Sequence, residues 1–128
     1  MGASGPALRI GVDIVSVGRI ADLAAARTAR GRRLFASDEL KRADSLKGER
    51  RAEFLAGRFA VKEAFAKAVG TVKGIEPRDI VCAAGQLGEP ALRLGATARV
   101  AMGRAGCTCS SVSISHDAGM AVAVVVLY

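Results

Sequence analysis

The segment Gly48–Val69 constrains the fold of this chain more than any other part of the sequence. Ala, Leu, Phe, Arg, Lys and Glu dominate it, and no proline occurs between its start and Pro77, a composition that favours a helix. Gly70 comes next, and glycine is common directly after the last turn of a helix. The sequence therefore predicts one long helix, around which the other elements are arranged.

Residues 8–15 predict a strand near the start of the chain. Apolar side chains occupy every second position of this segment, at Leu8, Ile10, Val12 and Ile14. Such alternation is typical of a strand that buries one face, and we expect these side chains to form that face.

Four later segments also predict strands. Residues 79–84 and 91–94 flank a turn rich in glycine, so they are expected to pair as a hairpin. Residues 111–116 and 118–127 are rich in Val, Ile and Ser, and they predict a second pair of strands that turns at Asp117-Ala118-Gly119.

Shorter helices are expected in three places. Ser16 is a candidate N-cap for a helix that reaches about Thr28, Ser37 is a candidate N-cap for a second, and residues 96–105 predict a third. We interpret the arginine-rich residues 30–33 as a turn. Adjacent strands mixed with helices indicate an α+β fold. We expect a single domain over residues 1–128, with the long central helix packed on a mainly antiparallel sheet and with residues 1–7 flexible.

The charge limits the classes of function. Lys and Arg total 19 against 12 Asp and Glu, a formal net charge of +7, so the surface attracts nucleic acid, an anionic membrane, or an acidic protein or phosphorylated metabolite. Aromatic residues make up 4% of the chain, too few for a typical base-stacking platform. No apolar stretch is long enough for a membrane span.

The cysteines indicate a reducing compartment. Cys82, Cys107 and Cys109 are an odd set without a CxxC pair, unlike the even sets of secreted disulfide scaffolds. The first residues also lack the charged and apolar regions of a secretory signal. We therefore expect a cytoplasmic protein whose cysteines are small core residues on strands.

Two carboxylates have positions that need an explanation. Asp13 interrupts an apolar strand, where an unpaired buried charge would be costly. It faces solvent, pairs with an arginine, or binds magnesium, and residue physics alone leaves these alternatives open. Glu63 precedes Lys67 by one helical turn, which makes them either an ordinary i,i+4 ion pair or part of a site. Lys62 adds positive charge on an adjoining face.

The two segments together resemble the signatures of a known family. Ile10-Gly11-Val12-Asp13, followed well downstream by Phe59-Ala60-Val61-Lys62-Glu63-Ala64-Phe65-Ala66-Lys67, is similar to the paired motifs of the 4′-phosphopantetheinyl transferases. The chain resembles the short, single-domain branch of that family, the holo-acyl-carrier-protein synthases. The likeness extends over nearly the whole length, through Phe35 with Glu39, Leu55-Ala56-Gly57-Arg58, Gly88-Glu89-Pro90 and Ser113-Ile114-Ser115-His116.

The resemblance implies a magnesium-dependent group transfer. It implies that Asp13 and Glu63 coordinate Mg2+ together with the pyrophosphate of coenzyme A. It also implies that the 4′-phosphopantetheine group passes to a serine of an apo acyl carrier protein and that 3′,5′-ADP leaves. Mg2+ prefers oxygen ligands and takes one or two carboxylates, so these residue types fit. By the same resemblance Glu63 is the expected base. Lys62 and Lys67 are expected to bind phosphate, and a lysine near the leaving group is a candidate proton donor.

Further positions are implicated at coenzyme A. His116, which is the only histidine, and Asp117 stand together at the end of a predicted strand. His116 is either a catalytic and coenzyme A-binding residue or a structural one satisfied by backbone groups. The resemblance also places Arg58, Gly88 and Pro90 at coenzyme A.

The sequence departs from the family pattern in two places. Glu89 stands in the hairpin turn where a lysine is usual, which weakens the case for a phosphate contact from that turn. Residues 70–75 are slightly longer than the usual glycine turn.

The positive charge has two expected partners under this interpretation, coenzyme A and an acidic acyl carrier protein of fatty acid or polyketide synthesis. Arg19 and Arg27 are the expected carrier-protein contacts, and the arginines of residues 30–33 form either a further steering cluster or a solvated basic face. The resemblance implies a homotrimer with active sites between subunits, and no nucleic-acid or membrane partner. The apolar run 120–127 suits a central strand at such an interface or in a monomer core.

Two other functions are the alternatives. A non-enzymatic basic module would bind nucleic acid through its arginines, with no role for Asp13 or Glu63. A degenerate, non-catalytic binder of coenzyme A is a second possibility, and the presence of both signature carboxylates counts against it.

Overall fold

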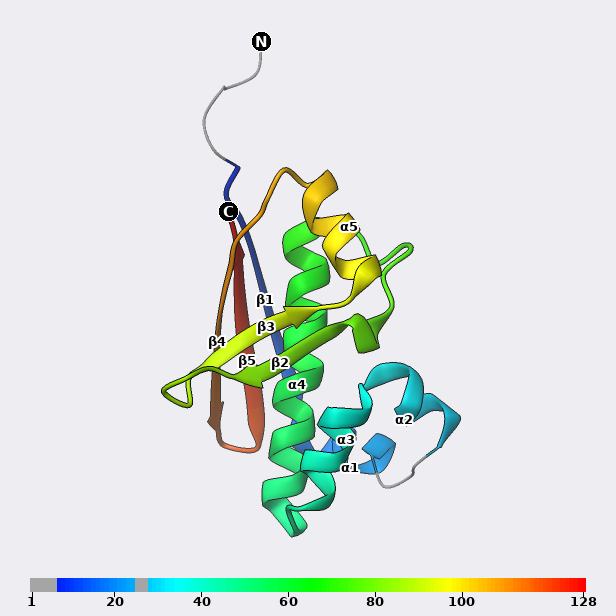
Figure 1. The fold of residues 1–128 in the computed structure, drawn as a ribbon. Coiled ribbons are helices and arrows are strands. Elements are labelled where there is room, and N and C mark those ends of the chain that lie inside the picture. The colour runs from blue at the N-terminus through cyan, green and yellow to red at the C-terminus, as the bar shows by residue number, and fades with distance from the viewer. Residues whose placement is uncertain (1–6, 25–27) are drawn as a thin grey trace.

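The long helix α4 (Gly48–Val69) runs through the centre of the molecule, with the other elements arranged around it (Figure 1). The computed structural model describes residues 7–24 and 28–128. The other elements are, in chain order, β1 (Arg9–Ser16), α1 (Val17–Ala24), α2 (Ala29–Leu34), α3 (Ser37–Asp44), the 3-10 helix η1 (Pro77–Asp79), β2 (Ile80–Ala84), β3 (Pro90–Leu94), α5 (Ala96–Arg104), β4 (Ser110–Asp117) and β5 (Met120–Leu127). Of the start expected to be flexible, residues 1–6 lie outside the described residues.

The predicted bounds of the long helix are confirmed. Gly70 ends α4 in the left-handed conformation, at φ 96°, and its N–H donates to the carbonyl oxygen of Ala66. One group of buried side chains joins Phe65 of α4 to Leu127 of β5. A second group joins Leu55 of α4 to Phe35, between α2 and α3. Because both groups share α4, this helix carries small or apolar residues on several faces instead of one.

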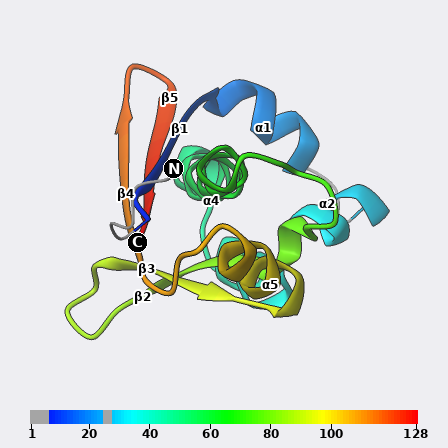
Figure 2. The same cartoon turned by 90° about the horizontal axis from the view of Figure 1, so that it is seen from above.

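The strands form two antiparallel sheets. β1, β5 and β4 make a three-stranded sheet in that order, and β2 pairs with β3 as the expected hairpin. Figure 2, which looks along α4, shows the three-stranded sheet on one side of the helix, the hairpin on another, and α1 and α2 on a third. The α+β class and the mainly antiparallel pairing are therefore confirmed.

The prediction for the buried face of β1 is wrong. Leu8, Ile10, Val12 and Ile14 are 74%, 68%, 53% and 60% exposed, and Gly11 instead lies buried against α4. A Cβ at Gly11 would overlap the carbonyl oxygen of Ala64, so the missing side chain is what lets the strand approach the helix backbone. Period-two alternation identifies two faces, but only this close contact decides which one α4 covers.

The apolar row of β1 continues across the outer face of the sheet. Val12 pairs with Val124 of β5, which in turn pairs with Ser113 of β4. The same pattern holds for Ile10 with Val126 and for Ile14 with Val122. The face turned away from α4 is therefore apolar over two strands and serine-lined on the third, and such a patch commonly marks an interaction site.

Two short helices begin differently from the predictions. The arginine-rich residues 30–33, which were expected to form a turn, belong to α2, where Thr28 Oγ1 accepts from Gly31 N at 3.2 Å as the cap. The N-cap of α3 is Ala36, not Ser37, and Glu39 Oε1 accepts from Ala36 N at 3.0 Å. The helix expected to reach Thr28 is α1, whose predicted end crosses residues 25–27, outside the described part.

The cysteines are only partly as expected. Cys82 is a buried strand residue, and burial raises the pKa of its thiol. Cys107 is buried but lies between α5 and β4, and Cys109 is exposed.

Among the described residues, no helix is long and apolar enough to cross a membrane.

Candidate active site

Asp13 and Glu63 are brought to neighbouring positions by the contact between β1 and α4. Asp13 lies two residues after Gly11, on the strand face that α4 covers, and its side chain is 14% exposed. Its Oδ1 accepts from Lys67 Nζ at 3.1 Å, and the carbonyl oxygen of Val12 accepts from the same ammonium at 3.1 Å. Its Oδ2 is buried and has no hydrogen-bond partner.

The electrostatics of Glu63 tie it to Asp13. Burial raises the pKa of the Glu63 carboxyl, the negative charge of Asp13 raises it further, and Lys67 opposes both effects. A raised pKa makes a carboxylate a better proton acceptor. The two carboxylates and one ammonium therefore form a single charged cluster across β1 and α4.

This cluster fits a divalent cation. Asp13 Oδ2 is a buried acceptor without a donor, and buried polar groups are normally satisfied. Within the described residues no group of three or more His, Cys, Asp or Glu side chains could hold a metal. Two carboxylates leave ligand places for phosphate and water, which is the arrangement Mg2+ prefers.

Lys67 makes a different ion pair from the one that helical spacing indicated. Among the described residues its ion-pair partner is Asp13, on another element, and not Glu63 one turn away. The ammonium has three donors, and two of them are used by Asp13 and Val12. The side chain is 57% exposed, so the third donor is available to a phosphate.

Lys62 lies in a different environment from the one predicted. Its side chain is 2% exposed, and its ammonium donates to Glu39 Oε1 at 2.7 Å, to Ile80 O at 2.6 Å and to Pro77 O at 3.1 Å. These contacts use all three donors of the ammonium. The geometry is at odds with the predicted phosphate contact, because tertiary contacts from α3 and η1 cover this face of the helix.

Arg58 occupies a setting suited to an anion. Its guanidinium lies over the Phe54 ring, 4.2 Å from the centroid, and its Nε is buried without a partner. With Arg42 and Arg93 it lines a hollow of about 230 Å³ between α3, α4 and the β2–β3 hairpin, where Asp38 and Glu39 also lie and Asp38 pairs with Arg93 at 3.0 Å.

His116 and Asp117 lie apart from the carboxylates within one chain. His116 Nε2 lies 2.9 Å from the carbonyl oxygen of Glu53, and a Cβ at Gly57 would lie 3.1 Å from the same nitrogen. Gly57 precedes Glu63 by about 9 Å along the helix axis at 1.5 Å per residue. The histidine is therefore at least partly satisfied by the backbone, which was one of its two alternatives.

Gly88 and Pro90 lie at the β2–β3 hairpin, whose turn projects away from α4 (Figure 1). Gly88 has φ 84°, and Glu89 Oε2 accepts from Leu87 N at 2.8 Å, so Glu89 serves the turn itself. Within one chain the hairpin tip does not join Asp13 and Glu63.

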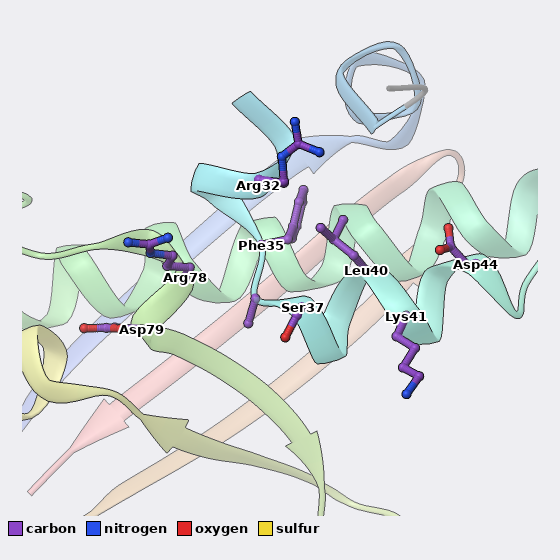
Figure 3. Close-up of a pocket in the computed structure, with 9 residues that line it drawn as sticks. Arg32, Phe35, Ser37, Leu40, Lys41, Asp44, Arg78 and Asp79 are labelled. Carbon is purple, nitrogen blue, oxygen red and sulfur yellow. The ribbon is translucent and has the colours of Figure 1, made fainter. Parts of the chain in front are cut away.

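The predicted carrier-protein contacts divide into two. Arg19 is exposed on α1, whereas Arg27 lies outside the described residues. No feature of the sequence indicated a hollow of about 700 Å³ between α2, α3 and η1, which is lined by Phe35 and Leu40 together with Arg32, Lys41, Arg78, Asp44 and Asp79 (Figure 3).

Comparison with known proteins identifies the family of this chain. The profile of the 4′-phosphopantetheinyl transferase superfamily matches residues 9–124. Holo-[acyl-carrier-protein] synthase of Frankia casuarinae is 40% identical over 117 residues, which cover 91% of this chain and 93% of that relative. The Neisseria meningitidis holo-[acyl-carrier-protein] synthase structure aligns with a TM-score of 0.80 at 32% identity, over 94% of this chain and 97% of that one. The Bacillus anthracis synthase, in complex with CoA (3′,5′-ADP), aligns with a TM-score of 0.76 at 36% identity, over 94% and 97%. The chain therefore belongs to the 4′-phosphopantetheinyl transferase superfamily and, within it, to the holo-[acyl-carrier-protein] synthases.

Proposed function

We propose that this chain transfers 4′-phosphopantetheine from coenzyme A to a serine of an apo acyl carrier protein, releases 3′,5′-ADP, and uses Mg2+ held by Asp13 and Glu63. The observation that carries the proposal is the buried, unpartnered Asp13 Oδ2 in the same charged cluster as Glu63. Leaving a carboxylate oxygen in that state is costly unless a cation completes the site.

The chain's own residues account for the proton and charge movements. Glu63, with its raised pKa, accepts the proton of the serine hydroxyl. The serine oxygen forms a bond to the pantetheine-bearing phosphorus, the bond from that phosphorus to the bridging oxygen breaks, and 3′,5′-ADP leaves with the electron pair. The remaining N–H of Lys67 faces the phosphates and stabilises or protonates the departing oxygen. When bound, Mg2+ supplies charge neutralisation at the phosphates.

The rest of coenzyme A is assigned to positions away from the carboxylates. Arg58 and His116 are expected at its phosphates, with Asp117 nearby, and the hairpin residues Gly88 and Pro90 are expected at its base. The unpartnered Arg58 Nε supports the binding of an anion beside the middle of α4. The complex of the Bacillus anthracis relative with CoA (3′,5′-ADP) supports coenzyme A as the donor.

We propose a homotrimer with sites between subunits. The apolar outer face of β1 and β5 supports burial against further copies of the chain, because exposed rows such as Ile10, Val12 and Ile14 are costly in water. The projecting β2–β3 hairpin supports the same assembly, since its tip can reach a neighbouring copy's carboxylates.

Arg19 is the proposed contact for an acidic carrier protein of fatty acid or polyketide synthesis. It lies on α1, which packs beside α4. The hollow lined by Arg32, Lys41 and Arg78 also contains Asp44 and Asp79, so it adds only a small positive excess on the side of α2 and α3 (Figure 3). Such a surface raises the association rate of an acidic partner and weakens with salt.

The test incubates purified protein with Mg2+, coenzyme A and apo carrier proteins, and measures by mass spectrometry the gain of one phosphopantetheine group. Glu63→Gln should lower kcat by about 10²–10⁴, the range for loss of a general base, and Asp13→Asn should raise the Mg2+ concentration needed for half-maximal rate. Glu49→Gln, an exposed substitution in the first turn of the same helix, is the control and should keep wild-type rates.

Two results would refute the proposal. An unchanged mass for every carrier protein, together with salt-sensitive oligonucleotide binding, would favour the nucleic-acid module. Wild-type rates and Mg2+ dependence in both carboxylate variants would remove the metal assignment.

A further inference from the structure

Lys62 and Glu39 form a buried ion pair that the proposed chemistry does not use. Both side chains are 2% exposed, and Lys62 Nζ lies 2.7 Å from Glu39 Oε1. The same ammonium donates to the carbonyl oxygens of Pro77 and Ile80 at 3.1 Å and 2.6 Å. One buried cation therefore joins three elements to α4: α3, η1 and β2.

These contacts hold the whole of η1. Pro77 is its first residue and Ile80 follows its last, so the ammonium holds a carbonyl at each end of this short helix. Glu39 Oε1 also accepts from Ala36 N, which ties the pair to the start of α3. A change at Lys62 would release both ends of η1 together.

The segment held in this way faces Glu63. Lys62 and Glu63 are consecutive on α4, and both line a small hollow of about 40 Å³ together with Pro77 and Ile80. The position of Pro77 and Ile80 sets the space beside the Glu63 carboxylate. Ala66, Val72 and Ile75 complete the lining, so the hollow is largely apolar.

The pair is poorly suited to stabilising the fold alone. Burial lowers the pKa of Lys62, and the charge of Glu39 opposes that effect. Taking two charges out of water often cancels their attraction, so buried ion pairs are frequently no more stabilising than apolar side chains of similar volume. Glu39 Oε2 also remains buried without a partner. Beyond stability, the pair fixes the positions of η1 and the start of α3 relative to α4, because each hydrogen bond has a defined length and angle.

We propose that Lys62 is a positioning residue, whose buried ammonium fixes η1 and the start of β2 opposite Glu63 and so sets the geometry in which the acceptor serine meets that carboxylate. Glu39 supplies the counter-charge. The inference rests on the proposed role of Glu63, and it replaces the phosphate contact that the sequence indicated for Lys62.

The test compares Lys62→Met, Glu39→Gln and the double variant with the wild type in the full-length protein. Methionine matches the length of the lysine stem without its charge, and glutamine keeps an oxygen that can accept from Ala36 N. Lys67→Met, on the same helix but exposed, is the comparator for a lysine that contacts phosphate. Each variant is assayed for kcat, for KM of coenzyme A, for thermal unfolding, and for amide hydrogen exchange over residues 77–80.

We expect Lys62→Met to lower kcat about tenfold or more while KM for coenzyme A stays within about twofold, since misplacement of a reacting group acts on the chemical step. Lys67→Met should raise KM for coenzyme A and also lower kcat, because Lys67 both contacts phosphate and assists the departing oxygen in the proposed function, so the KM effect is what separates the two lysines. The double variant removes both buried charges, so it should unfold nearer the wild-type temperature, yet keep the low kcat and show faster exchange over residues 77–80.

Three results would overturn the inference. Recovery of wild-type kcat in the double variant would restrict the pair to a role in folding. A raised KM for coenzyme A in Lys62→Met, as in Lys67→Met, would restore the phosphate contact. Unchanged amide exchange over residues 77–80 would show that Lys62 does not hold η1. The exchange measurement does not depend on catalysis, so it tests this inference even if no protein, wild type included, transfers the group. Absence of transfer in the wild type would refute the proposed function instead.

Discussion

Gly11→Ala tests the contact on which the candidate active site depends. The backbone of Gly11 is ordinary strand, with no positive φ, so the substitution adds only the volume of one methyl group. That methyl would overlap the carbonyl oxygen of Ala64 and would lie 2.7 Å from Ala68 N. Both atoms belong to the backbone of α4, so no side-chain rotation can relieve the clash.

The expected loss of stability follows from the separation required. Non-bonded heavy atoms in protein interiors lie about 3.5–4.0 Å apart, so the contact with Ala68 N alone requires β1 and α4 to separate by about 1 Å, and the overlap with the carbonyl oxygen of Ala64 requires more. Overpacking of this kind typically costs about 1–3 kcal/mol, and we expect the upper end, about 3 kcal/mol, because backbone is involved on both sides. For a domain of this size that loss lowers Tm by about 10 °C. The same shift moves Asp13 away from Glu63, so transfer activity should fall as well.

The measurement is urea unfolding of Gly11→Ala beside Gly103→Ala. Gly103 lies in α5 with no atom within 4 Å of the added Cβ, so its replacement should stabilise the helix by up to about 1 kcal/mol. The two identical substitutions are thus expected to act in opposite directions. A Gly11→Ala protein within about 0.5 kcal/mol of wild type, the usual range for an unconstrained surface site, would show that β1 does not lie against α4 as described.

Three further predictions concern the assembly, the partner and pH. Val12→Lys places a charge in the middle of the apolar outer face and should convert the proposed trimer to monomers in light scattering; a monomeric wild type would refute the proposed assembly. Arg19→Glu should raise KM for the carrier protein about fivefold, the equivalent of about 1 kcal/mol, with KM for coenzyme A unchanged, and equal effects on both would exclude a docking role. Asp79→Ala removes the carboxylate that accepts from Thr97 N at 2.9 Å and from Thr97 Oγ1 at 2.6 Å at the start of α5, and should cost about 1 kcal/mol at neutral pH. The hydrogen bond from the Thr97 hydroxyl lowers the pKa of Asp79. The stability that the Asp79 carboxylate contributes is therefore present above the usual aspartate pKa of about 4 and is lost as the pH falls through the lowered value. If the free energies of unfolding of wild type and variant failed to converge in acid, the prediction would be contradicted.

Local composition was sufficient to predict most of the elements. The bounds of α4 follow from a proline-free run of strong helix formers that ends at Gly70. The β2–β3 and β4–β5 pairs follow from apolar runs that flank turns containing glycine. These signals depend on residues that are close in sequence, so they can be recognised without knowledge of the tertiary contacts. The arginine-rich residues 30–33 were missed as a helix because the cap that begins α2, Thr28, was assigned to the end of the preceding helix.

The importance of Asp13 and Glu63 was also indicated by the sequence, through the resemblance of their two segments to a known family. Their mutual arrangement was not. Helical spacing allowed an ion pair between Lys67 and Glu63 as one of two alternatives, whereas the ammonium bridges to Asp13 on a strand that is distant in sequence. Spacing along one helix cannot rank a neighbour on the same element against a partner brought in by packing.

The sequence by itself determined that β1 has two unlike faces and that α4 carries Lys62 beside Glu63. Only the tertiary structure decided which face of β1 is covered, and it chose the polar one, because Gly11 admits the backbone of α4 and leaves Ile10, Val12 and Ile14 outside. It also decided that Lys62 is enclosed by α3 and η1 while Lys67 stays exposed. In each case the deciding quantity is the distance between segments far apart in the chain, which depends on close packing and not on local residue preference.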